Sequence, residues 1–127
     1  MNKPAPAPTE IRLHKKSRCL ELVYGSGENF SLPCEYLRVF SPSAEVRGHG
    51  PGQEVLMVGK ESVSIVAIEP VGHYAVRLKY SDGHDTGLYT WQYLQELGRL
   101  KETNWQGYLD RLEEAGYVRK VPDEAAE

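Results

Sequence analysis

The sequence predicts a small α+β fold, in which two or three short helices pack on a mainly antiparallel β-sheet. Apolar and polar residues alternate in several runs, Gly- or Pro-containing turns separate these runs, and other segments carry apolar residues at helical spacing. The connections are short, and a parallel crossover needs about a dozen residues or more, so the strands should pair antiparallel. With 127 residues, 40% of them apolar, the chain fits one domain that can bury its own core.

Four runs of the chain alternate as strands do. EIRLH and RCLELVY, separated by the polar KKS, predict a hairpin, and SVSIVAI (62–68) and HYAVRLKY (73–80) predict two further strands. The last run should bury one face and leave the other in water. The residues on its buried face are Tyr74, Val76, Leu78 and Tyr80.

Two helices are predicted from their end signals. The first should begin with Pro33, which suits a first helical position, and should stop at Pro42. The second should follow Thr90, a candidate N-cap, and end before Gly98.

A third helix, Thr103–Gly116, gives the clearest helical pattern. Thr103 and Gln106 match a capping box, and Gly116 is typical of a residue just past a helix end. Its apolar side should dock on the rest of the domain through Trp105, Tyr108, Leu109, Leu112 and Ala115.

Two segments resemble each other, YGSGENFSLPCEYL and YSDGHDTGLYTWQYL. Each has a tyrosine, a Gly-containing turn, a leucine eight residues after the tyrosine, and a helix with Tyr-Leu. Gly83 then aligns with Gly27, and His84 with Glu28. The similarity indicates an internal hairpin-helix repeat, although over so few positions it can also arise by chance.

The predicted organisation is a disordered tail (1–8), a domain (9–98), a helical extension (99–119) and a second disordered tail (120–127). Within the domain, RGHGPGQ is too rich in Gly and Pro for a strand or helix, so it should be an exposed loop. Loops of this kind are often functional, which makes Arg47, His49 and Gln53 candidates for an interaction loop.

Charge and composition exclude several classes. The net charge is −3 and the basic residues are scattered, which argues against a nucleic-acid partner. No apolar run has the length of a membrane span or of a signal peptide, so we expect a cytoplasmic protein without a membrane partner. Cys19 and Cys34 lie outside any zinc-binding spacing and should be packing residues.

His84 stands in an Asp-Gly turn between Asp82 and Asp85. The favoured interpretation is a half-exposed turn residue whose replacement by alanine would cost little stability. The alternative is a weak iron or zinc site formed by His84, Asp82, Asp85 and His49. On either interpretation no cofactor is required for folding.

Three stretches carry a family resemblance: IRLHKKSRCLELVY, LPCEYLRVFSPSAEVRGHG and IEPVGHYAVRLKYSDGHDTGLYTWQYL. They resemble the bacterial stand-alone form of the gamma-butyrobetaine hydroxylase-like N-terminal domain, a domain of unknown function, over about residues 9–98. The resemblance implies a small α+β module. It also implies a link to iron enzymology, because relatives precede the catalytic domain of 2-oxoglutarate oxygenases or are fused to P-loop ATPases that carry iron-sulfur clusters.

The hydroxylase form of this family holds a structural zinc with three cysteines and one histidine. The resemblance places His84 at the histidine position and Ser41, Ser43 and Val46 at the cysteine positions. Serine and valine are poor zinc ligands, so it implies that the hydroxylase-type zinc site is absent.

No catalytic motif such as GxSxG or HExxH occurs, and we do not expect an enzyme. The first expectation is a non-catalytic binding or adaptor module with a protein partner, linked to iron or iron-sulfur proteins. A weak metal-binding protein comes second, and a small enzyme third.

Overall fold

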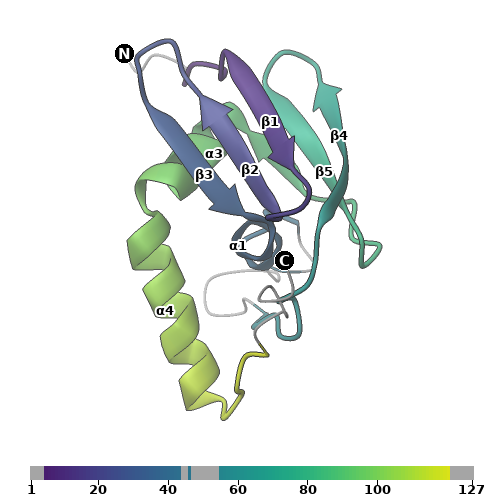
Figure 1. Cartoon of the computed structure of the whole chain (residues 1–127), viewed down its shortest axis with the longest axis vertical. Helices are drawn as coiled ribbons and strands as arrows, with labels where there is room; N and C mark the ends of the chain where they lie inside the picture. The colour runs from purple at the N-terminus through teal and green to yellow at the C-terminus, as the bar shows by residue number, and fades with distance from the viewer. Residues whose placement is uncertain (1–4, 44–45, 47–54, 121–127) are drawn as a thin grey trace.

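The computed structural model describes residues 5–43, 46 and 55–120. It confirms the α+β class, with the strands in two three-stranded antiparallel sheets, ordered β1-β2-β3 and β4-β5-β6, rather than in one sheet. Figure 1 shows both sheets at one end of the molecule, with α1 beneath them and α4 along one side. In chain order the elements are β1 (Glu10–His14), β2 (Cys19–Val23), β3 (Asn29–Pro33), α1 (Cys34–Val39), β4 (Ile65–Val71), β5 (Ala75–Tyr80), β6 (Leu88–Thr90), α3 (Trp91–Arg99) and α4 (Lys101–Glu114).

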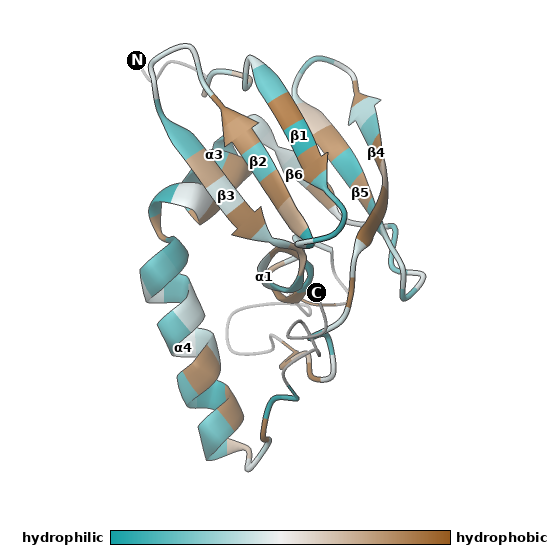
Figure 2. Ribbon diagram, in the orientation of Figure 1, coloured by the Kyte–Doolittle hydropathy of each residue, from teal (hydrophilic) through white to brown (hydrophobic). Residues whose placement is uncertain are grey.

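The four predicted strands are present, with two differences in their details, and β3 and β6 are two further strands that the sequence pattern did not predict. β1 and β2 form the predicted hairpin, and Figure 2 shows the alternation of polar and apolar residues along β1. β4 begins at Ile65 instead of Ser62, because β5 ends at Tyr80, which pairs with Ile65. Tyr74 lies in the turn before β5 and is 54% exposed, so it is not on the buried face.

The N-cap predicted at Thr90 is confirmed, since its hydroxyl accepts a hydrogen bond from the Tyr93 backbone N–H at 3.1 Å. Two other expected boundaries are wrong. Pro33 is the last residue of β3 and the N-cap of α1 rather than its first residue. Gly98 lies inside α3, where it lets the helix approach β3: a Cβ there would come within 2.5 Å of the Phe30 ring.

The C-terminal helix also starts earlier than its capping-box pattern indicates. α4 begins at Lys101 with Leu100 as N-cap, so Thr103 is an interior residue. A single residue, Leu100, joins α3 to α4, and its carbonyl accepts from the Asn104 N–H at 2.8 Å. The expected end at Gly116 is confirmed by its φ of 74°. Its N–H and that of the next residue bond back to the last-turn carbonyls, as in a Schellman motif.

The structure supports the internal repeat. Each half is a three-stranded antiparallel sheet followed directly by a helix. In the first half Tyr24 N bonds to Glu28 O at 2.9 Å, and in the second Tyr80 N bonds to His84 O at 2.9 Å. Gly27 and Gly83 both take positive φ in these turns, 97° and 90°. The two turns therefore share one backbone geometry as well as one residue pattern.

Two equivalent tyrosine hydrogen bonds connect the two halves. Tyr36 of α1 donates its hydroxyl hydrogen bond to the Leu97 carbonyl of α3 at 2.6 Å. Tyr93 of α3 donates to the Phe40 carbonyl at the end of α1, also at 2.6 Å. Leu97 follows Tyr93 by four positions, as Phe40 follows Tyr36, so the two bonds are equivalent under the repeat.

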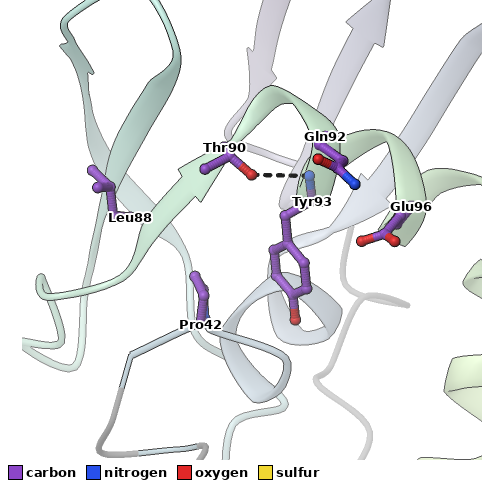
Figure 3. A pocket seen from close by; sticks show the side chains of 6 residues that line it. All are labelled: Pro42, Leu88, Thr90, Gln92, Tyr93 and Glu96. Atoms are coloured by element: carbon purple, nitrogen blue, oxygen red, sulfur yellow. Dashed lines mark hydrogen bonds between the residues drawn. The ribbon is translucent and has the colours of Figure 1, made fainter. Parts of the chain in front are cut away.

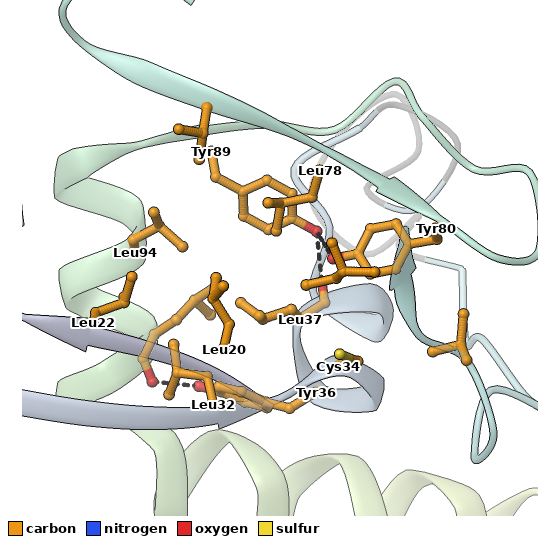
Figure 4. Packing of buried hydrophobic residues seen from close by; sticks show 14 of the residues in the cluster. Leu20, Leu22, Leu32, Cys34, Tyr36, Leu37, Leu78, Tyr80, Tyr89 and Leu94 are labelled. Carbon is orange, nitrogen blue, oxygen red and sulfur yellow. Dashed lines mark hydrogen bonds between the residues drawn. The ribbon is translucent and has the colours of Figure 1, made fainter. Parts of the chain in front are cut away.

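The main core lies between the two sheets and the helices (Figure 4). α4 docks beside it, as expected, through buried Tyr108 and Leu112, with Trp105 and Leu109 partly buried. Ala115, which was also assigned to the docking side, is exposed at the end of the helix. None of the described helices is both long and apolar enough to cross a membrane. The largest fully buried apolar side chains of the core are Leu20, Leu22, Leu32, Cys34, Tyr36, Leu37, Leu78, Tyr89, Leu94 and Leu97.

Candidate functional site

Buried polar side chains gather where the end of α1 meets the turn after β5. Within residues 5–43, 46 and 55–120, Arg38, Ser41, Ser43 and His84 are each less than a tenth exposed. They come from segments more than forty positions apart along the chain. Buried polar groups require partners, so this cluster is the first place to look for a site.

His84 is buried, not half-exposed as expected, with 6% of its surface accessible. Its Nε2 lies 2.8 Å from the Ser41 hydroxyl, which is itself 1% exposed. Gly87 explains the burial: a Cβ there would come within 2.5 Å of the Ser41 Oγ, so only glycine lets the turn approach Ser41 so closely. The centre of the His84 ring lies 6.0 Å from the centre of the Tyr80 ring.

Asp82 accepts hydrogen bonds from two cations on one oxygen. Its Oδ2 lies 2.9 Å from Arg38 Nε and 2.7 Å from Lys60 Nζ, while Oδ1 accepts from the His84 backbone N–H at 3.1 Å. Burial alone would raise the pKa of Asp82. The hydrogen bonds from Lys60, His84 and Arg38 outweigh burial and lower that pKa to about 2. Asp82 is therefore a fixed negative charge at neutral pH.

Arg38 is a charged residue with 4% exposure on a helix whose residues are all buried. Its Nη1 is buried and has no hydrogen-bond partner among the residues that the structure describes. The guanidinium carbon lies 6.0 Å from the centre of the Tyr80 ring. Sequence reasoning overlooked Arg38 and Lys60, because neither belongs to a motif; an arginine next to the apolar positions of a short helix was the available signal.

The described part of the structure does not bring the four predicted metal ligands together. Asp82 and His84 have the partners given above, Asp85 is exposed on the turn, and His49 lies outside the described residues. In the described part of the chain, no group of three or more His, Cys, Asp or Glu side chains could hold a metal ion. The candidate interaction loop, Arg47 to Gln53, also lies outside that part.

The positions that the resemblance assigned to zinc ligands do lie around His84. Ser41 bonds to His84, and Ser43 Oγ lies 2.8 Å from the Thr86 hydroxyl in the same turn. Val46 is buried at 5% exposure. Two neutral hydroxyls and an aliphatic chain do not fit a closed zinc centre, which needs thiolate or imidazole ligands. In the structure both serines form hydrogen bonds to residues of the turn that contains His84.

A groove opens on the surface between the segment after α1 and the start of α3 (Figure 3). Its volume is ≈ 340 Å³ and it is open to solvent. Tyr93 forms one wall, and its ring is held because its hydroxyl donates to Phe40 O. No sequence signal pointed to this groove, since only folding brings Pro42 beside the segment from Leu88 to Glu96 that supplies the other lining residues. The lining residues are Pro42, Leu88, Thr90, Gln92, Tyr93 and Glu96.

Comparisons with known proteins agree with this fold. A solution NMR structure shares 50% identity and a TM-score of 0.79, covering 94% of this chain and 93% of its own; a second shares 49% identity and a TM-score of 0.79, covering 92% and 87%. A crystal structure of a DUF971-family protein of unknown function from Acidithiobacillus ferrooxidans ATCC 23270 shares 42% identity and a TM-score of 0.63, covering 76% and 98%.

None of the curated proteins compared with the chain matches it. Residues 11–95 match the family described as gamma-butyrobetaine hydroxylase-like, N-terminal. This match spans most of the chain, including most of α3 and both sheets except for Glu10. The chain therefore belongs to the gamma-butyrobetaine hydroxylase-like N-terminal domain family.

Proposed function

We propose that this protein is a non-catalytic module that binds another protein through the groove between Pro42 and Glu96. The groove carries the proposal, because it is an open surface with a preformed wall. Its volume is at the lower end of the roughly 300–1,000 Å³ typical of small-molecule pockets. An open groove of this size fits a short stretch of an extended chain better than an enclosed substrate.

The lining indicates what the groove would take. Pro42, Leu88 and the Tyr93 ring offer an apolar contact, and Glu96 is the charged member of the lining. No described residue forms an ion pair with Glu96. Charge complementarity thus favours a partner segment that presents an apolar side chain followed by a lysine or arginine.

The buried cluster supports a non-catalytic role. A serine hydrogen-bonded to a histidine is part of many hydrolytic sites, but Ser41 and His84 are 1% and 6% exposed, so a substrate could not reach the hydroxyl. Asp82 is held by two cations, which makes it a poor proton acceptor. These groups serve the architecture of the turn. The association of the family with iron enzymology makes iron and iron-sulfur proteins the first partners to test.

The test compares two charge reversals on the surface. Glu96→Lys changes the groove, and Glu114→Lys makes the same change at the exposed end of α4. A protein captured by wild type and by Glu114→Lys, but not by Glu96→Lys, would be purified and its affinity measured by calorimetry. We expect Glu96→Lys to weaken binding by about tenfold or more. Equal affinity of all three proteins for the partner would contradict the proposal.

A further inference from the structure

β6 is an edge strand, because it pairs with β5 on one side and with no described strand on the other. In an antiparallel pair, successive residues point their backbone N–H and C=O groups alternately toward the partner strand and away from it. The Trp91 N–H bonds to the Tyr74 carbonyl at 3.1 Å, which fixes this alternation. Tyr89 therefore bonds to β5, whereas the N–H and C=O of Leu88 point away from β5, toward the open edge.

This open edge borders the groove described above. Leu88 and Thr90 line the groove from β6, and Tyr93 forms one wall (Figure 3). Leu88 is partly exposed, and among the described residues no group bonds to its backbone N–H or C=O. An edge strand with unpaired backbone groups is a template for a further strand. The groove thus offers backbone hydrogen bonds as well as side-chain contacts.

The first half of the internal repeat shows how the equivalent edge is satisfied. Ser31 is the third residue before α1, as Leu88 is the third residue before α3. The Cys34 N–H bonds to the Arg18 carbonyl at 2.8 Å, so Ser31 also points its backbone groups away from its partner strand. The Ser31 carbonyl accepts a hydrogen bond from the Lys101 ammonium at 3.0 Å. In the described part of the second half, no side chain takes the place of this lysine at Leu88.

We propose that a partner protein binds in the groove as an extended segment that pairs with β6 and adds a fourth strand to the β4-β5-β6 sheet. One residue of the segment would donate its N–H to the Leu88 carbonyl and accept a hydrogen bond from the Leu88 N–H. The groove would select the side chains, with an apolar one at the Tyr93 ring and a lysine or arginine at Glu96. This inference rests on the proposed function, because it gives the binding mode of a partner in the same groove.

The probe is a capped peptide selected from a library of random linear peptides on the immobilised protein, and kept only if Glu96→Lys abolishes its binding. Each backbone amide of the peptide is then methylated in turn, and the affinities are measured by calorimetry. Methylation removes an N–H and keeps the side chain. We expect binding to weaken about tenfold or more at the amide that bonds to Leu88, and to change little at its two neighbours, whose N–H groups point the other way.

Three variants of the protein test the same hydrogen bonds from the other side. Leu88→Pro removes the outward N–H, which an edge strand tolerates because this group does not bond to β5. Leu88→Ala keeps the N–H and shortens the side chain, so the comparison isolates the backbone group. Ser31→Pro is the matched control, since it makes the same change at the equivalent position of β3. We expect Leu88→Pro to bind the peptide about tenfold more weakly than Leu88→Ala, and Ser31→Pro to bind it as wild type does.

The outcomes separate strand pairing from the groove itself. Equal affinity of Leu88→Pro and Leu88→Ala, or an equal loss at every methylated amide, would overturn the strand pairing and leave the groove as a binding site. Selection of no peptide that depends on Glu96 would contradict both proposals. The methylation series uses wild-type protein, so it decides the question even where Leu88→Pro does not fold.

Discussion

Replacing His84 by alanine tests the central claim that this turn is packed onto the end of α1. The substitution removes the 2.8 Å hydrogen bond between His84 and the Ser41 Oγ. The Ser43 backbone N–H, 3.3 Å away, still donates to that buried hydroxyl. Losing a buried partner costs about 1–3 kcal/mol, and the space left by the ring adds roughly 1 kcal/mol. We therefore expect a loss of about 2–4 kcal/mol in the free energy of unfolding.

Urea denaturation followed by tryptophan fluorescence measures this loss. For a chain of this size it corresponds to a fall in melting temperature of roughly 8–15 °C. His73→Ala is the control, because His73 is exposed and its carbonyl, which accepts from the Trp91 indole N–H, is kept. That change should stay within about 0.5 kcal/mol of wild type. If His84→Ala and His73→Ala were equally stable, the packed-turn description would be wrong.

Four further predictions follow from other parts of the structure. Trp105→Ala should lower the free energy of unfolding by about 2 kcal/mol in a urea titration, since its ring packs on the main core; an unchanged midpoint would refute the docked helix. Gly87→Ala should cost about 1–3 kcal/mol because its Cβ meets Ser41, whereas Gly107→Ala, with open space in α4, should gain up to about 1 kcal/mol. Asp82 has a lowered pKa, so its pairing stabilises the fold above the unfolded value near 4 and is lost as pH falls toward 2; Asp82→Asn should abolish that part of the acid dependence in melts from pH 2 to 5. Chelator should leave the melting temperature unchanged, because the positions that the resemblance assigns to zinc ligands carry hydroxyl and aliphatic groups; a large loss of structure would show that a metal supports the fold.

Local patterns in the sequence were sufficient for much of the fold. Alternation identified β1, β2 and β5, and the cap at Thr90 and the glycine after α4 were recognisable because each acts through its immediate neighbours. The start of β4 could not be recognised in this way. It is set by the end of its partner strand β5, which lies in another segment of the chain.

The candidate sites depended on contacts that no local pattern encodes. His84 was predicted to be half-exposed because Asp-Gly turns usually face solvent. The close approach at Gly87 that buries it involves Ser41, a residue 46 positions before Gly87. Arg38 and Lys60 meet only through Asp82, and the groove joins the end of one half to the start of the helix in the other. The family resemblance did better, since it carried tertiary information: it placed Ser41 beside the histidine turn.

The two tyrosine hydrogen bonds that connect the halves also affect how the chain folds. They join residues 61 and 53 positions apart, so neither can form until both halves are in place. Contacts of such long sequence separation raise the contact order and slow folding relative to a helical protein of the same length. A half expressed alone would leave its tyrosine hydroxyl and its acceptor carbonyl without their partners. Two halves expressed as separate chains would supply these groups to each other, so we expect them to associate.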